Sequence, residues 1–151
     1  MRISIGADHA GFALKQHIVE ALRQDGHQVD DAGTHSAESC DYPDFAAPVA
    51  RAVASGAADR GILVCATGAG ISIAANKIKG VRAALAYHPE EVQLTRQHND
   101  ANILAIGAKF TDAATALQYV KLFLETAFTG GRHERRVYKM MRLEDQGPEN
   151  S

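Results

Sequence analysis

The chain has 151 residues, of which 46% are apolar, and a formal net charge of −2. This length favours one compact core, and the near-neutral charge disfavours nucleic acid and acidic membrane surfaces as partners. The N-terminal segment lacks the apolar stretch of a signal peptide, and no apolar run approaches the roughly 20 residues of a membrane span. The two cysteines, Cys40 and Cys65, form neither a CxxC pair nor a disulfide framework. We therefore expect a cytoplasmic protein.

Short apolar runs alternate along the chain with segments of helical period. Leu14, Ile18 and Leu22 share one stripe of the first such segment, which Gly26 ends. Pro48 leaves the start of the second helix open. In chain order we expect a strand over 2–7, a helix over 11–26, a strand over 27–33, a helix over 44–56, a strand over 60–66, a helix over 70–80, a strand over 81–87, a helix over 89–98, a strand over 102–108, and helices over 111–128 and 132–145.

Five strands that alternate with helices predict a parallel sheet covered on both faces, because each crossover between parallel strands is long and right-handed. The expected fold is α/β: a three-layer α/β/α sandwich with a five-stranded, Rossmann-like parallel sheet and an added C-terminal helix. Residues 1–145 are expected to form a single domain, and residues 146–151 a disordered tail.

Ligands of such sheets bind outside the carboxyl ends of the strands. Polar side chains follow four of the predicted strands there: Asp8 and His9, Cys65 and Thr67, Tyr87 and His88, and Lys109. His98 and Asn99 instead precede the fifth strand, which predicts that a single subunit places them at the opposite edge.

The loop Gly68-Ala69-Gly70 opens a helix after a strand, where backbone N–H groups can hold an anion. Ile73 replaces the third glycine of a GxGxxG dinucleotide fingerprint, and no GK[ST] follows that would make a P-loop. A nucleotide cofactor is therefore disfavoured.

Cys65 has two interpretations. Free cysteines are among the most buried residues, so a small buried hydrophobe is the ordinary one. At the end of a strand and facing a helix N-terminus, however, its thiolate is favoured. Thr67 adds a hydroxyl, and the amides from Gly68 to Ile71 can stabilise an oxyanion. This combination suits proton abstraction beside a carbonyl.

The seven histidines suggest a metal site, but none form the i, i+4 pair of a zinc helix, and "HERRV" at 133–137 is not HExxH. We therefore expect no metal. Arg132 and Arg136 lie on one face of the last predicted helix, as a phosphate clamp requires. A solvated basic turn is the alternative interpretation of these arginines.

Five motifs together resemble one known family. They are "GADHAGFALK" (6–15), "DYPDFA" (41–46), "CATGAGISIAANK" (65–77), "RQHNDAN" (96–102) and "GGRHERRV" (130–137). In this order they closely resemble the type B ribose-5-phosphate isomerases, a family that includes allose-6-phosphate and galactose-6-phosphate isomerases. The resemblance covers residues 1 to about 140 and is far less specific for one sugar than for the family.

The resemblance implies a role for each matching position. Cys65 would be the base that moves a proton between C1 and C2 of an open-chain sugar phosphate. Thr67 and the amides of Gly68, Ala69 and Gly70 would hold the enediolate oxygen, and His98 would help open the sugar ring. The further residues implied to bind substrate are Asp8, His9, Tyr42 and Asn99, with Arg132, Arg136 and His9 at the phosphate.

The resemblance also implies the partners. Members of the family use no metal or organic cofactor, and they form homodimers or homotetramers whose sites combine residues of two subunits. Such a site would let His98 and Asn99 reach the Cys65 of a neighbouring chain.

Two positions depart from the family pattern. Ala66 replaces a glycine beside the reacting carbons, and Lys109 stands where many members have arginine, which keeps the charge but loses the bidentate fork. Both belong to the expected substrate site and leave the chain length of the sugar open. The sequence therefore predicts a ribose 5-phosphate isomerase, with an isomerase of a four- or six-carbon sugar phosphate and a non-catalytic sugar-phosphate-binding module as alternatives.

Overall fold

A computed structural model of the chain describes residues 1–147. The expected tail, 146–151, falls mostly on residues 148–151, which lie outside the described residues. The elements are β1 (Arg2–Ala7), α1 (Phe12–Gln24), β2 (Gln28–Asp31), α2 (Pro43–Ala54), β3 (Arg60–Cys65), α3 (Ala69–Ala75), β4 (Ala83–Leu85), α4 (Pro89–Asn99), β5 (Ile103–Gly107), α5 (Ala113–Glu125), α6 (Arg132–Arg142) and the 3-10 turn η1 (Leu143–Asp145).

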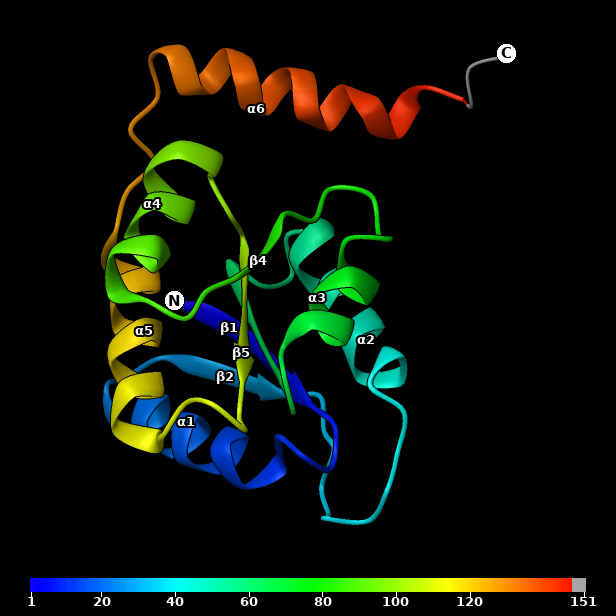
Figure 1. Ribbon diagram of the computed structural model, residues 1–151, viewed down its shortest axis with the longest axis vertical. Coiled ribbons are helices and arrows are strands. Elements are labelled where there is room, and N and C mark those ends of the chain that lie inside the picture. The colour runs from blue at the N-terminus through cyan, green and yellow to red at the C-terminus, as the bar shows by residue number, and fades with distance from the viewer. Residues whose placement is uncertain (148–151) are drawn as a thin grey trace.

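The five strands form one parallel sheet in the order β2-β1-β3-β5-β4 (Figure 1). The chain passes from β3 over β5 to the edge strand β4 and returns to β5, so the central strands are β1, β3 and β5. In their register Ala7 of β1 pairs with Val64 of β3, and Cys65 of β3 pairs with Gly107 of β5. The expected α/β fold with a five-stranded parallel sheet and a C-terminal helix is confirmed.

Side chains of the central strands alternate between the two faces, because the side-chain period of a strand is two. Ile62 and Val64 pack with α1, α4 and α5, whereas Leu63 and Cys65 pack with α2 and α3. Figure 1 shows these two helical layers on opposite sides of the sheet. All four residues are at most 4% exposed. Burial on both faces explains why 62–65 is a continuous apolar run.

α6 belongs to neither layer. It lies across the end of the molecule from which the strands start (Figure 1). Of its residues only His133 is buried, while Tyr138 is 61% exposed and Met140 39% exposed. A helix that buries so little of its own surface depends on other contacts for its stability.

The observed β4 spans only three residues, although the apolar run predicts 81–87. The register explains where the strand begins: Ala83 pairs with Ile103, the first residue of β5, so residues 81 and 82 have no strand beside them. The side-chain amide of Asn76 lies on the outer side of Ala83. It donates to the carbonyl of Ala83 over 2.9 Å and accepts from the N–H of Ala83 over 2.8 Å. Asn76 thus occupies the outer edge of β4 as a neighbouring strand would.

A buried lysine pairs with a carboxylate inside the fold. Lys15 of α1 is fully buried, and its Nζ donates to both carboxylate oxygens of Asp31 over 2.8 and 2.7 Å. Asp31 also accepts from the N–H of Gly33 over 3.0 Å. The pair therefore ties α1 to the loop that follows β2. Among the described residues, no helix is long and apolar enough to cross a membrane.

Candidate active site

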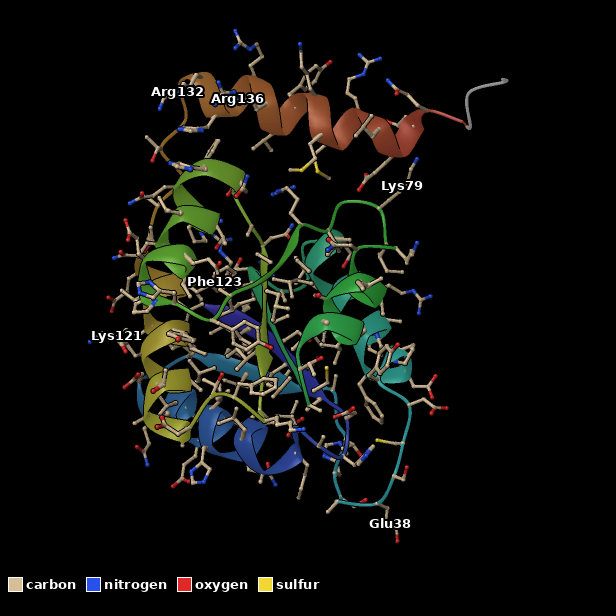
Figure 2. The ribbon with its side chains drawn as sticks, in the orientation of Figure 1. Glu38, Lys79, Lys121, Phe123, Arg132 and Arg136 are labelled. Carbon is tan, nitrogen blue, oxygen red and sulfur yellow. The ribbon has the colours of Figure 1, made fainter. Side chains whose placement is uncertain are left out.

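The structure places the expected site residues in two groups at opposite ends of the sheet. The loops after β1, β3 and β5 meet at the carboxyl end because these strands run parallel. The amino end holds the last turn of α4 and the first turns of α6 (Figures 1 and 2). The first group consists of Asp8, His9, Tyr42, Cys65, Ala66, Thr67, Gly68, Ala69, Gly70 and Lys109, and the second of His98, Asn99, Arg132 and Arg136.

Cys65 is the last residue of β3 and is 4% exposed. Its Sγ accepts a hydrogen bond from the N–H of Gly68 over 3.2 Å. Gly68 adopts a φ of 77°, a left-handed conformation that glycine tolerates, and a Cβ there would lie 3.0 Å from the Ile106 backbone. The loop therefore turns tightly enough to direct an N–H at the sulfur.

Thr67 lies at the tip of this loop and is exposed. Its Oγ1 accepts from the N–H of Ala69 over 3.2 Å, so the hydroxyl hydrogen is available to a ligand. Gly70 lies beneath the ring of Tyr42, because a Cβ at Gly70 would lie 2.7 Å from its Cζ. The absence of a side chain thus brings Tyr42, at the start of α2, against the loop after β3.

Asp8 is buried directly after β1. Its Oδ1 accepts from the N–H groups of Ala10 and Gly11 over 3.0 and 3.1 Å, and its own N–H donates to Val64 of β3. A Cβ at Gly11 would lie 2.5 Å from the Val64 carbonyl oxygen. The turn after β1 therefore packs closely against the strand that ends in Cys65.

His9 is half-buried and is held by the loop before α2. Its Nδ1 lies 3.1 Å from the backbone nitrogen of Cys40, whose N–H donates to it. Because an accepting Nδ1 carries no hydrogen, the neutral ring has its N–H on Nε2. His9 thus presents a donor to a ligand at this end of the sheet.

The loop after β5 lies beside the loop after β3. The N–H groups of Ala108 and Lys109 donate to the carbonyls of Cys65 and Ala66, both over 2.9 Å. Lys109 is exposed. Backbone pairing therefore places Lys109 beside the loop after β3, and its ammonium lies 5.9 Å from the centroid of the Phe110 ring.

Sequence reasoning assigns no role to Tyr87. In the structure its hydroxyl donates to the carbonyl of Thr67. Partial burial raises the pKa of Tyr87, and the nearby charge of Cys65 raises it further. The position of Tyr87 just after a predicted strand was the available signal. Its contact with Thr67, 20 residues earlier in the chain, becomes visible only in the structure.

At the amino end, the rings of His98 and His133 are stacked, with centroids 4.2 Å apart and an interplanar angle of 10°. Burial lowers the pKa of His133, and the charges of His98, Arg132 and Arg136 lower it further. Asn99 is the last residue of α4. Arg132 and Arg136 are exposed at the start of α6, as labelled in Figure 2. The stack thus places His98 against His133, whose surroundings also include the charges of the two arginines.

Comparison with known proteins identifies the family to which the chain belongs. Residues 3–140 match the family model described as Ribose/Galactose Isomerase. The chain belongs to the ribose/galactose isomerase family. It is 47% identical over 145 residues to ribose-5-phosphate isomerase B of Escherichia coli K12, covering 96% of this chain and 97% of the relative.

Solved structures agree with this membership. Clostridium thermocellum ribose-5-phosphate isomerase B superposes with a TM-score of 0.95 at 50% identity, over 96% of this chain and 98% of that one. Ribose-5-phosphate isomerase B from Mycoplasma genitalium with bound ribulose-5-phosphate has a TM-score of 0.93 at 41% identity, over 97% of each chain. The resemblance to the family is confirmed, and the chain is a sugar-phosphate isomerase of the aldose–ketose class.

Proposed function

We propose that the chain interconverts ribose 5-phosphate and ribulose 5-phosphate, with Cys65 as the base. The observation that carries this proposal is the hydrogen bond from the N–H of Gly68 to Cys65 Sγ, at a strand end where Thr67, Asp8 and Tyr42 also gather. The substrate pair is further supported by relatives named ribose-5-phosphate isomerase B, one of them with bound ribulose-5-phosphate.

The proposed chemistry transfers one proton between two carbons. The Cys65 thiolate takes the proton from C2 of the open-chain aldose, and the electron pair forms the enediolate double bond. The Thr67 hydroxyl and the amides of Gly68, Ala69 and Gly70 stabilise the oxygen that gains charge. Cys65 then returns its proton to C1, which gives the ketose, and a proton passes from O2 to O1.

Binding is proposed to involve both ends of the sheet. Asp8, His9 and Tyr42 bind sugar hydroxyls beside Cys65, with Ala66 lining the loop and Lys109 contributing charge. His98 assists ring opening, and Asn99 contacts the sugar. Arg132 and Arg136, together with His9, hold the phosphate through charge-assisted hydrogen bonds.

One chain holds these two groups at opposite ends, so we propose an active homodimer, or a homotetramer built from such dimers. A second chain would bring its His98, Asn99 and arginines to the Cys65 of the first. Three exposed apolar side chains lie near the amino end of the sheet: Tyr138, Met140 and Leu143. Their exposure is consistent with a second subunit that covers them.

Comparing kcat/KM for ribose 5-phosphate, allose 6-phosphate, galactose 6-phosphate and a tetrose phosphate tests the substrate. We expect ribose 5-phosphate to exceed the others by at least about tenfold, because a missing or clashing carbon unit changes transition-state binding by that order. A higher value for a four- or six-carbon sugar would transfer the assignment to that substrate. Tight binding of all four without turnover would favour the non-catalytic module.

Exhaustive chelation is expected to leave the isomerase rate unchanged, because the proposed proton transfer uses a thiolate and hydrogen-bond donors only. Among residues 1–147, no group of three His, Cys, Asp or Glu side chains is arranged to hold a metal ion. The rate is measured before and after dialysis against a chelator, with a known metalloenzyme treated in parallel. A rate lost to the chelator and restored by a divalent cation would contradict the proposal.

A further inference from the structure

The peptide unit between Thr67 and Gly68 is hydrogen-bonded on both sides. Its carbonyl accepts from the Tyr87 hydroxyl, and its N–H donates to Cys65 Sγ over 3.2 Å. Because the peptide unit is planar and rigid, the hydroxyl that holds the carbonyl also fixes the direction of the N–H. The phenol and the thiol are thus joined through one peptide plane.

Tyr87 is itself held in place, although the residue is 41% exposed. Its backbone carbonyl accepts from the Tyr119 hydroxyl of α5 over 2.7 Å. Its ring meets the ring of Phe110 edge to face, with centroids 6.1 Å apart. The direction of the Tyr87 hydroxyl is therefore set by α5 and by the loop after β5.

Strand β5 leaves room for the contact between the Tyr87 hydroxyl and the Thr67 carbonyl. A Cβ at Gly107 would lie 2.6 Å from the Thr67 carbonyl oxygen and would also collide with the Tyr87 hydroxyl. Gly107 pairs with Cys65 in the sheet register. The glycine thus creates the space in which the hydroxyl and the carbonyl meet, directly beside the residue that carries the thiol.

We propose that Tyr87 is a positioning residue, which favours the Cys65 thiolate by fixing and polarising the Thr67–Gly68 peptide. A hydrogen bond to the carbonyl draws electron density from the peptide, so its N–H becomes a stronger donor. A stronger donor to the sulfur stabilises the thiolate relative to the thiol. The catalytic meaning of this inference rests on the proposed function, in which Cys65 is the base.

The raised pKa of Tyr87 agrees with this arrangement, since the phenol keeps its hydrogen and remains a donor near neutral pH. The other titratable side chains around this end of the sheet include Asp8, His9, Tyr42 and Lys109, from the loops after β1 and β5 and from the start of α2. At the start of α4 they also include His88 and Glu91, whose carboxylate accepts from the Tyr87 N–H over 2.8 Å. Tyr87→Phe removes only the phenol hydroxyl and leaves all of these groups in place. A change in the thiol can then be assigned to the removed hydroxyl.

The direct test measures the alkylation of Cys65 by iodoacetamide against pH in the wild type and in Tyr87→Phe. Cys65 falls on the tryptic peptide 61–77 and Cys40 on the peptide 24–51, so mass spectrometry follows each thiol separately. We expect the pH midpoint for Cys65 to move upward by about 0.5 to 1 unit, with a rate about 3- to 10-fold lower on the acid side. The midpoint for Cys40 should not move.

Kinetics give a second measurement. In Tyr87→Phe the acid limb of the pH profile of kcat/KM should move upward by the same amount, with KM at the optimum nearly unchanged. Tyr138→Phe is the matched control, because it removes a tyrosine hydroxyl that is bonded to Arg142 of its own helix and not to the Thr67–Gly68 peptide. Tyr119→Phe should move the midpoint in the same direction as Tyr87→Phe, but by a smaller amount. It replaces Tyr87→Phe as the test variant if Tyr87→Phe does not fold.

An unchanged Cys65 midpoint in folded Tyr87→Phe, or in Tyr119→Phe where it serves instead, would overturn the inference whatever its activity. An equal shift in Tyr138→Phe would overturn it as well, because the effect would then not belong to the Thr67–Gly68 peptide. The alkylation needs no turnover, so it remains decisive even if Cys65→Ala retains activity and the proposed base is wrong. If the alkylation midpoint of Cys65 shifts and the pH profile of kcat/KM does not, the result would support the positioning of the thiol and contradict the role of Cys65 as the base.

Discussion

Cys65→Ala is expected to lower kcat by about 10²- to 10⁴-fold, the range that one positioned general base contributes. The lost interaction belongs to the transition state, so substrate binding should stay close to that of the wild type. Steady-state rates give kcat, and calorimetric titration with the substrate gives the affinity. Since the side chain packs among Leu63, Ile71 and Ala105, replacement by the smaller alanine keeps the site apolar.

Cys40→Ala is the matched control for this experiment. It removes the other thiol and keeps the backbone N–H that donates to His9, so its kcat should remain near the wild-type value. A Cys65→Ala enzyme with near-normal kcat would refute the assignment of the base. Asp8, the buried carboxylate after β1, would be the next residue to test.

Mixing inactive Cys65→Ala chains with inactive His98→Ala chains is expected to restore activity. In a hybrid dimer with shared sites, one site receives both altered residues and the other receives both intact ones. Random exchange of equal amounts makes half of the dimers hybrid, so about a quarter of the wild-type activity should return. Isomerase rates are followed after mixing, while native mass spectrometry of isotope-labelled chains measures the exchange.

The control replaces the His98→Ala partner by a Cys65→Ala, His98→Ala double variant, which can supply no intact site in any combination. This mixture should stay inactive. Full exchange without recovered activity in the first mixture would show that each chain uses its own Cys65 and His98. The placement of these residues at opposite ends of one sheet argues for recovery.

The element order and the carboxyl-end residues could be predicted from the sequence because their causes are local. Apolar runs gave the strands, and the loop positions of Asp8, Cys65 and Lys109 followed from the ends of those strands. The place of β5 between β3 and β4 could not be predicted in this way, because it depends on pairing between segments far apart in the chain.

The remaining contacts depend on partners distant in sequence. Lys15 lies on an amphipathic helix, where a lysine is ordinarily exposed, and only the position of Asp31 explains its burial. The stack of His98 on His133 and the contact of Tyr87 with Thr67 likewise join separate loops and helices. Periodicity and spacing carry no information on such pairs.

The Asn76 amide on the outer side of β4 has a consequence for how copies of the chain can associate. An open edge strand is a template on which another strand can add, and repeated addition leads to fibrous aggregates. Both backbone groups of Ala83 are already bonded to Asn76, and β4 is only three residues long, so little of this edge is open to a further strand. Polymerisation through β4, one of the two edges of the sheet, is thereby opposed.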